Sequence, residues 1–146
     1  MGSKTPAASA WLIVRGLALV GLADATYLTV EHFLGTIPPC TVGGCELVLT
    51  SEYATLGPIP IALLGAFYYL AVFLVTLPSA RLTVQMRRRG LWLLVGLGSL
   101  TTLGLFYIQA VILNAYCLYC LLSAGITLSL VAVTLASPLR PLRHGD

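Results

Sequence analysis

Apolar residues form four long stretches along the chain, and polar residues gather in the segments between them. The stretches extend over about 11–34, 59–77, 91–113 and 117–136. An α-helix needs roughly 20 apolar residues to cross a bilayer core of about 30 Å, so each stretch predicts a transmembrane helix. Strands of a membrane barrel would alternate apolar and polar residues, which residues 91–95 do not. The pattern predicts an all-α membrane protein, a four-transmembrane-helix bundle in which residues 1–146 form a single membrane domain.

The composition supports this fold class and narrows the function. Of the 146 residues, 58% are hydrophobic and 9% are charged, and the mean hydropathy is +0.95. A soluble domain has about 25% charged residues, so this chain has too few polar side chains to cover a soluble globule. These values exclude a cytosolic enzyme, a nucleic-acid-binding protein and a disordered tail, and they make the lipid bilayer the expected environment.

The basic residues indicate how the helices are oriented. All eight occupy the N-terminal part of the chain, the connection between the second and third stretches, or the C-terminal tail: Lys4, Arg15, Arg81, Arg87, Arg88, Arg89, Arg140 and Arg143. Because cytoplasmic segments carry an excess of Lys and Arg, we expect both termini in the cytoplasm. The loop at 35–58 and the turn at 114–116 contain no Lys or Arg, which predicts that they lie on the outer face.

The first stretch has a second interpretation. Its sequence Ala23-Asp24-Ala25 follows an apolar segment and resembles the small-x-small site of a cleaved signal peptide. The apolar pattern continues through 27–30, which favours a retained helix.

Four cysteines, all predicted on the outer face, offer the most distinctive chemistry of the sequence. Cys40 and Cys45 lie in the first outer loop, and Cys117 and Cys120 form a C-x-x-C at the start of the last helix. Disulfides persist outside the cytoplasm, but four cysteines allow three pairings and the spacing does not choose among them. A helix N-terminus favours a thiolate, and two adjacent glycines in the loop indicate mobility. A mobile dithiol that meets an external protein and then the helix-borne pair would make a two-stage relay.

Two other uses of the cysteines remain open. Two structural disulfides could hold the outer loops of a non-enzymatic membrane scaffold. Four thiolates could bind zinc or copper, since ligands at this spacing suit tetrahedral coordination. Oxidising compartments compete for thiols, and the sequence offers no accompanying ligand set, so we expect no metal.

The order of these features resembles the vitamin K epoxide reductase family, specifically its short bacterial branch. The resemblance covers about 27–120 and rests on the cysteines, the sequence VLTSEYA at 48–54, the GPIP entry to the second helix at 57–60, Gly65 with Tyr68, and the CLYC motif at 117–120. A loop cysteine followed six residues later by Ser51, together with a distant C-x-x-C, is a specific combination.

The resemblance implies an enzyme of the bacterial inner membrane that couples disulfide exchange to quinone reduction. Cys40 and Cys45 are expected to exchange with a thioredoxin-like periplasmic protein, which becomes oxidised. Electrons are expected to reach Cys117 through a transient Cys45–Cys117 bridge, and Cys120 is expected to face and reduce ubiquinone or menaquinone. Ser51 resembles the family's hydroxyl residue near the quinone pocket, which implies a supporting role.

Two departures from the family pattern modify these expectations. Many bacterial members carry a thioredoxin-like domain after the last helix, whereas this sequence ends at Asp146, so the partner is expected to be a separate protein. The animal branch has a threonine-tyrosine pair just after its C-x-x-C, which is tied to vitamin K chemistry. Here residues 121–124 are Leu-Leu-Ser-Ala, so epoxide reduction is not expected.

Three polar residues within the apolar stretches are further candidates. Asp24 lies in the middle of the first stretch, where a carboxyl group is costly. It is either a proton carrier for quinone reduction or a neutral acid bonded to Thr26 or to a neighbouring helix. Gln109 and Asn114 lie near the outer end of the third stretch, and either amide could donate a hydrogen bond to a quinone carbonyl. We predict a quinone contact for Asn114, whereas hydrogen bonding between helices is favoured for Gln109.

Overall fold

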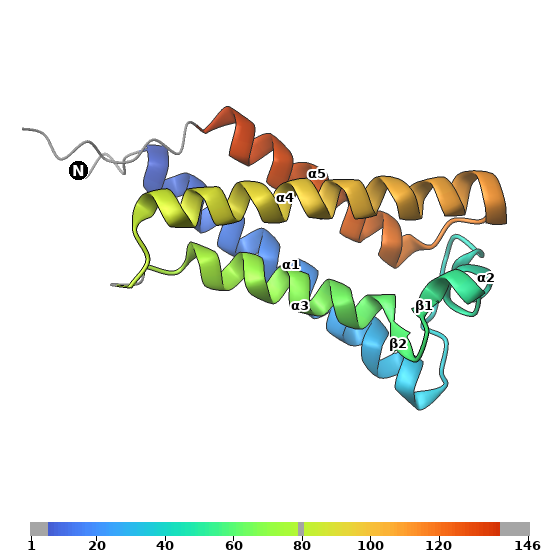
Figure 1. Cartoon of the computed structure of the whole chain (residues 1–146). Helices are drawn as coiled ribbons and strands as arrows, with labels where there is room; N and C mark the ends of the chain where they lie inside the picture. Colours follow the sequence, from blue (N-terminus) through green and yellow to red (C-terminus); the bar gives the residue numbers. More distant parts are fainter. Residues whose placement is uncertain (1–5, 79–80, 138–146) are drawn as a thin grey trace, which may run out of the picture.

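The computed structural model describes residues 6–78 and 81–137. Four long helices pack against one another, and the short elements gather at one end of them (Figure 1). The long helices are α1 (Pro6–Leu34), α3 (Ile61–Thr76), α4 (Val84–Tyr107) and α5 (Leu118–Ala136). The short elements are α2 (Cys45–Leu49), the 3-10 helix η1 (Glu52–Ala54), the strands β1 (Thr55–Leu56) and β2 (Ile59–Pro60), and the π-helix η2 (Ile108–Leu113).

Three helical segments are long and apolar enough to cross a membrane: Ala8–Leu34, Val84–Leu113 and Leu118–Ala136. The helix α3 is apolar as well but has only 16 residues. Large apolar side chains cover the outside of these helices, as Leu93 and Leu100 illustrate with exposed fractions of 75% and 70%. Such a surface suits lipid rather than water. The protein is therefore a helical membrane protein, as the composition predicts.

The second long helix begins two residues after its predicted start. Ile59 and Pro60 instead form β2, which pairs antiparallel with β1 so that Leu56 lies opposite Ile59 and Thr55 opposite Pro60. Gly57 makes the turn with a φ of 64°, a conformation that residues with side chains rarely adopt. This short hairpin leads the chain from the outer loop into α3.

The buried core lies where the four long helices meet. Small residues allow these helices to approach one another closely. The members of the core are Ala10, Val14, Ala18, Ala25, Tyr69, Val72, Leu91, Val95, Ile126 and Leu130. Gly21 of α1 lies so close to the ring of Tyr69 in α3 that any side chain there would overlap the ring. The Tyr69 hydroxyl in turn lies 2.7 Å from Oγ of Ser123 in α5. The aromatic residue thus links three helices.

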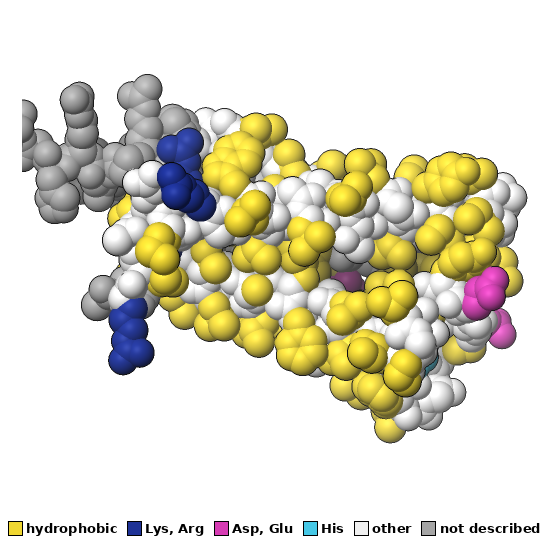
Figure 2. All heavy atoms as spheres, viewed as in Figure 1, with side chains coloured by type: hydrophobic (Ala, Val, Ile, Leu, Met, Phe, Trp, Pro, Cys, Tyr) yellow, Lys and Arg dark blue, Asp and Glu magenta, His cyan; other side chains and the backbone are white. Residues whose placement is uncertain are grey.

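Basic and acidic side chains occupy opposite ends of the bundle. Lys and Arg gather at the end where α3 connects to α4, and the exposed acidic side chains lie at the end with the short elements (Figure 2). Asp24, in the middle of α1, is buried. Arg15 donates a hydrogen bond of 2.7 Å to the Thr76 carbonyl, and Arg87 donates one to the same oxygen. These cations satisfy the C-terminus of α3, where the helix dipole is negative. Of the basic residues that predict the orientation, Lys4, Arg140 and Arg143 lie outside the described residues.

The helix α4 begins well before the predicted start at residue 91. The side chain of Thr83 caps it by accepting a hydrogen bond of 3.3 Å from the Met86 backbone N–H. The three consecutive arginines at 87–89 are consequently helical. A single cap therefore extends the helix through a polar segment that the hydrophobic pattern assigns to a connection.

Candidate redox site

A disulfide joins Cys40 and Cys45 in the loop between α1 and α3, with their Cα atoms 6.0 Å apart. Cys45 is the first residue of α2 and is fully buried. The structure therefore selects one of the three pairings that the spacing leaves open. Cys117 and Cys120 are free thiols, so the four cysteines form one oxidised and one reduced pair.

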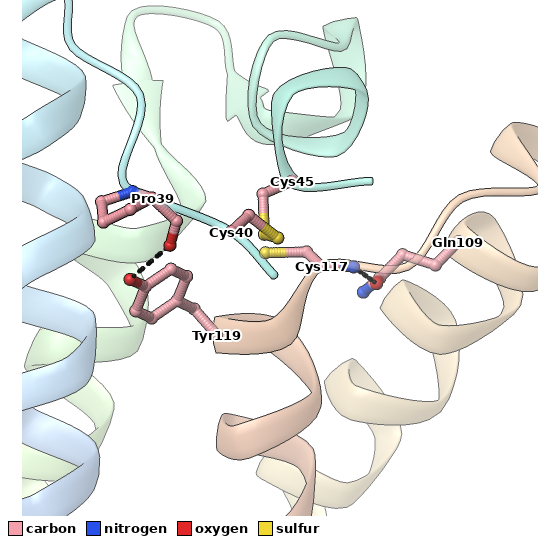
Figure 3. Close-up of a disulfide and its surroundings, with 6 residues drawn as sticks. All are labelled: Pro39, Cys40, Cys45, Gln109, Cys117 and Tyr119. Carbon is pink, nitrogen blue, oxygen red and sulfur yellow. Dashed lines mark hydrogen bonds between the residues drawn. A yellow bond between two sulfur atoms is a disulfide. The ribbon is translucent and has the colours of Figure 1, made fainter. Parts of the chain in front are cut away.

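Cys117 is fixed at the N-terminus of α5 by its backbone. It is the N-cap residue of that helix and has no exposed surface. Its N–H donates a hydrogen bond of 3.0 Å to Oε1 of Gln109 in η2 (Figure 3). The π-helix ends at Asn114 in a left-handed conformation with φ of 48°. This turn reverses the chain and brings the Gln109 amide beside the start of the next helix.

The sulfur of Cys117 points towards the disulfide of the loop (Figure 3). Cys117 and Cys45 form a buried cluster with Val48, against which Cys40 and Cys120 pack. The arrangement suits thiol–disulfide exchange, in which a thiolate attacks one sulfur of a disulfide.

Two contacts hold the loop over the start of α5. The hydroxyl of Tyr119 donates a hydrogen bond of 3.0 Å to the Pro39 carbonyl, next to Cys40 (Figure 3). Gly44, which precedes Cys45, lies against the backbone of Tyr116. The loop between the cysteines is thus anchored, although its glycines predict mobility.

The thiol of Cys117 is activated by its neighbour in the C-x-x-C. A hydrogen bond from the Cys120 thiol lowers the pKa of Cys117 to about 7, and burial opposes this effect. A thiol ordinarily has a pKa of about 8.5. At neutral pH, a substantial fraction of Cys117 is therefore the nucleophilic thiolate.

This pKa predicts a pH profile. In a chain with Cys40→Ala and Cys45→Ala, the ultraviolet absorbance of a single thiolate should appear with a midpoint of about pH 7. Below that midpoint the thiolate fraction should fall by about tenfold per pH unit, and in the wild-type chain the rate at which Cys117 attacks the loop disulfide should fall with it. Adding Cys120→Ala removes the donor and should shift the midpoint upward towards about 8.5. An unchanged midpoint would show that Cys120 is not the cause.

Beneath the cysteines, a cavity of about 1070 Å³ opens between the long helices. Most of its lining is apolar and comes from α1, α3, α4, α5 and the outer loop. Cys120 lines it from α5, whereas Cys117 faces the loop disulfide. Concave, largely apolar sites with a few polar groups are typical of small-molecule binding. One thiol of the reduced pair therefore faces a disulfide, and the other lines a ligand-sized cavity.

The polar candidates from the sequence differ in their relation to this cavity. Ser51 lines it, and its hydroxyl donates a hydrogen bond of 2.7 Å to the Val48 carbonyl. Gln109 also lines it and is 4% exposed. Asn114 is exposed and is not among the described residues that line the cavity. The quinone contact predicted for Asn114 has no support from its position and stays a prediction.

Sequence reasoning favours a bond between helices for Gln109, and the bond from η2 to the N-cap of α5 confirms this. The partner, the backbone N–H of Cys117, is not predicted. The available signal was the position of Gln109 eight residues before the cysteine, combined with an asparagine that tolerates a left-handed turn. Over the described residues, no group of three or more His, Cys, Asp and Glu side chains is arranged to hold a metal ion.

Comparison with known proteins agrees with this geometry. Residues 12–135 match the sequence profile of the vitamin K epoxide reductase family. None of the curated proteins matches the chain. The matched segment includes all four cysteines and most of the bundle. The protein therefore belongs to the vitamin K epoxide reductase family, whose members are oxidoreductases.

Proposed function

We propose that this protein is a quinone-dependent thiol–disulfide oxidoreductase that oxidises a separate thioredoxin-like protein outside the cytoplasm. The observation that carries the proposal is the position of the C-x-x-C pair. Cys117 faces the loop disulfide, and Cys120 lines the cavity between the long helices. Electrons can therefore enter at one thiol and leave at the other without large movements of the bundle.

The proposed relay consists of two disulfide exchanges. A reduced partner gives two electrons to the Cys40–Cys45 disulfide, so that the partner gains a disulfide and the loop becomes a dithiol. Cys45 then attacks Cys117 of an oxidised C-x-x-C, and Cys40 resolves the transient Cys45–Cys117 bridge. The loop disulfide is restored, and Cys117 and Cys120 are left as thiols. This is the redox state of the structure.

The residues of the cavity fit a quinone. The lining is mostly apolar, with polar atoms from Ser51 and Gln109 near Cys120, so a ring with two carbonyl groups finds both kinds of contact. When bound, a quinone supplies an acceptor for two electrons and two protons. Ser51 is retained from the predicted quinone contacts, and Gln109 replaces Asn114 in the proposal.

We also propose that α3 crosses the membrane with the three longer helices, so that the whole chain forms one domain with four spans. At 1.5 Å per residue, its 16 residues extend about 24 Å. Its C-terminus lies among arginines, and its N-terminus follows the loop hairpin. By the excess of basic residues at one end, that end is cytoplasmic and the cysteines are on the outer face of a bacterial inner membrane.

The test is quinone reduction by the purified protein in detergent, supplied with a reduced thioredoxin-like protein and followed by quinone absorbance. We expect turnover with ubiquinone or menaquinone and one partner disulfide formed for each quinone reduced. A chain with Cys117→Ala and Cys120→Ala is the control and should be inactive. Absence of turnover with several partners and both quinones, in protein shown to be folded, would instead favour a scaffold held by disulfides.

A further inference from the structure

Two polar atoms in the bundle are buried without a hydrogen-bond partner among the described residues. They are Oδ2 of Asp24 in α1 and the hydroxyl oxygen of Tyr68 in α3. Asp24 is only 9% exposed. Burying a polar group without a partner is costly, and most buried polar groups in proteins are paired. Both groups therefore need an explanation that the fold itself does not supply.

The buried threonine side chains of the helices are paired within their own helix. The hydroxyls of Thr29, Thr127 and Thr134 donate hydrogen bonds of 2.7, 3.1 and 2.6 Å to backbone carbonyls one turn earlier. Asp24 has no such bond, and Thr26, the partner that the sequence suggests, is exposed. The structure thus contradicts the interpretation of Asp24 as an acid bonded to Thr26.

The two unpaired groups share the cavity with one thiol of the reduced pair, that of Cys120. Asp24, Tyr68 and Cys120 line it from α1, α3 and α5. Asp24 is close enough to act electrostatically on both thiols of the C-x-x-C. Glu31 and Glu52 line the same cavity, but the Thr36 hydroxyl already donates a hydrogen bond to the Glu31 carboxylate, and Glu52 is exposed. Asp24 is therefore the acid whose hydrogen-bonding capacity is left for a ligand.

We infer that Asp24 carries a proton from the Cys120 thiol to the bound quinone, and that the Tyr68 hydroxyl donates a hydrogen bond to a quinone carbonyl. The inference rests on the proposed function. Catalytic acids and bases in proteins are typically carboxyl groups placed in such low-dielectric sites. Water enters an apolar cavity between helices poorly, so a carboxyl group beside the thiol can transfer the proton that water would otherwise carry.

The reaction balances. Oxidation of Cys117 and Cys120 breaks two S–H bonds, forms one S–S bond, and releases two electrons and two protons. The quinone takes both electrons and gains two protons. Asp24 gives its carboxylic acid proton to a quinone oxygen and takes the proton of Cys120 in its place, so its protonation state is unchanged after the reaction. The proton of Cys117 is released to solvent as its sulfur enters the disulfide, and the reduced quinone takes its second proton from solvent to become the hydroquinone.

The test is single-turnover reduction of ubiquinone by protein in which Cys117 and Cys120 are reduced. Asp24→Asn has the same shape but cannot carry a proton, and we expect the rate to fall by about 100-fold. Asp24→Glu should recover part of the rate. Tyr68→Phe should weaken ubiquinone binding by about fivefold, as expected for one hydrogen bond. Glu46→Gln removes an exposed acid outside the cavity and is the matched control.

A second readout does not depend on turnover. Infrared difference spectra, recorded with and without ubiquinone on protein with the C-x-x-C oxidised, should show a shifted carboxylic acid band that is absent in Asp24→Asn. Exchange between the reduced partner and the Cys40–Cys45 disulfide should be unchanged in that variant. A wild-type rate in Asp24→Asn, or equal slowing of both half-reactions, would overturn the inference. If wild-type protein itself fails to reduce quinone, the proposed function fails instead.

Discussion

Replacing Cys120 with alanine should abolish quinone reduction and leave a covalent bridge between Cys45 and Cys117. In the structure, Cys117 faces the loop disulfide and shares a buried cluster with Cys45. Its thiolate can attack Cys45 and release Cys40 as a thiol. Without Cys120, no sulfur of the C-x-x-C can resolve the bridge, so only the return attack by Cys40 competes with it.

The bridge is measured by mass spectrometry of peptides from alkylated, non-reduced protein. In a chain with Cys40→Ala and Cys120→Ala, the return attack by Cys40 is removed as well. The Cys45–Cys117 bridge should then be the dominant species after mild oxidation. A chain with Cys117→Ala and Cys120→Ala is the control and should retain the Cys40–Cys45 disulfide alone. Quinone turnover in the Cys120→Ala protein, or a bridge from Cys40 to Cys117, would contradict the relay.

The sequence predicts the bundle well because membrane helices have a simple physical signature. Backbone groups in lipid must pair within their own segment, so a long apolar stretch has few alternatives to a helix. The predicted helix boundaries are wrong where local interactions determine the start of a helix. Ile59 and Pro60 belong to a hairpin set by Gly57, and Thr83 caps a helix that starts in a polar segment. Hydrophobic periodicity contains no information on either.

The sequence identifies the four cysteines of the candidate site, but it does not identify the residues that hold them in place. The C-x-x-C and the loop pair are visible as motifs, but their pairing depends on how the loop closes. The roles of Gln109 and Asn114 depend on one π-helical turn, which moves the glutamine towards Cys117 and leaves the asparagine exposed. A left-handed residue explains an asparagine there without any ligand. Backbone geometry of this kind cannot be read from spacing alone.

Replacing Gly44 with alanine should slow electron transfer from the loop pair to the C-x-x-C by about 100-fold, the order expected when reacting atoms are displaced by about 1 Å. A Cβ atom at Gly44 would lie 2.5 Å from the carbonyl oxygen of Tyr116 and 2.7 Å from its nitrogen. Both are backbone atoms of the segment between η2 and α5, so neither can rotate away as a flexible side chain would.

The position of this contact explains the size of the effect. Gly44 directly precedes Cys45, and Tyr116 directly precedes Cys117. Any separation of the two backbones therefore moves apart the two sulfurs that must bond. Gly44 has a φ of −107°, which alanine adopts without strain, so the loss arises from the contact and not from the backbone conformation.

Two half-reactions separate this effect from a general loss of structure. Reduction of ubiquinone by fully reduced Gly44→Ala protein should proceed at the wild-type rate, because Cys117 and Cys120 are untouched. Reduction of ubiquinone by the reduced partner through the loop pair should be slow. Gly96→Ala, whose Cβ would have no atom within 4 Å, should match wild type in both. Equal rates in Gly44→Ala and Gly96→Ala would show that the approach of the two backbones does not control the relay.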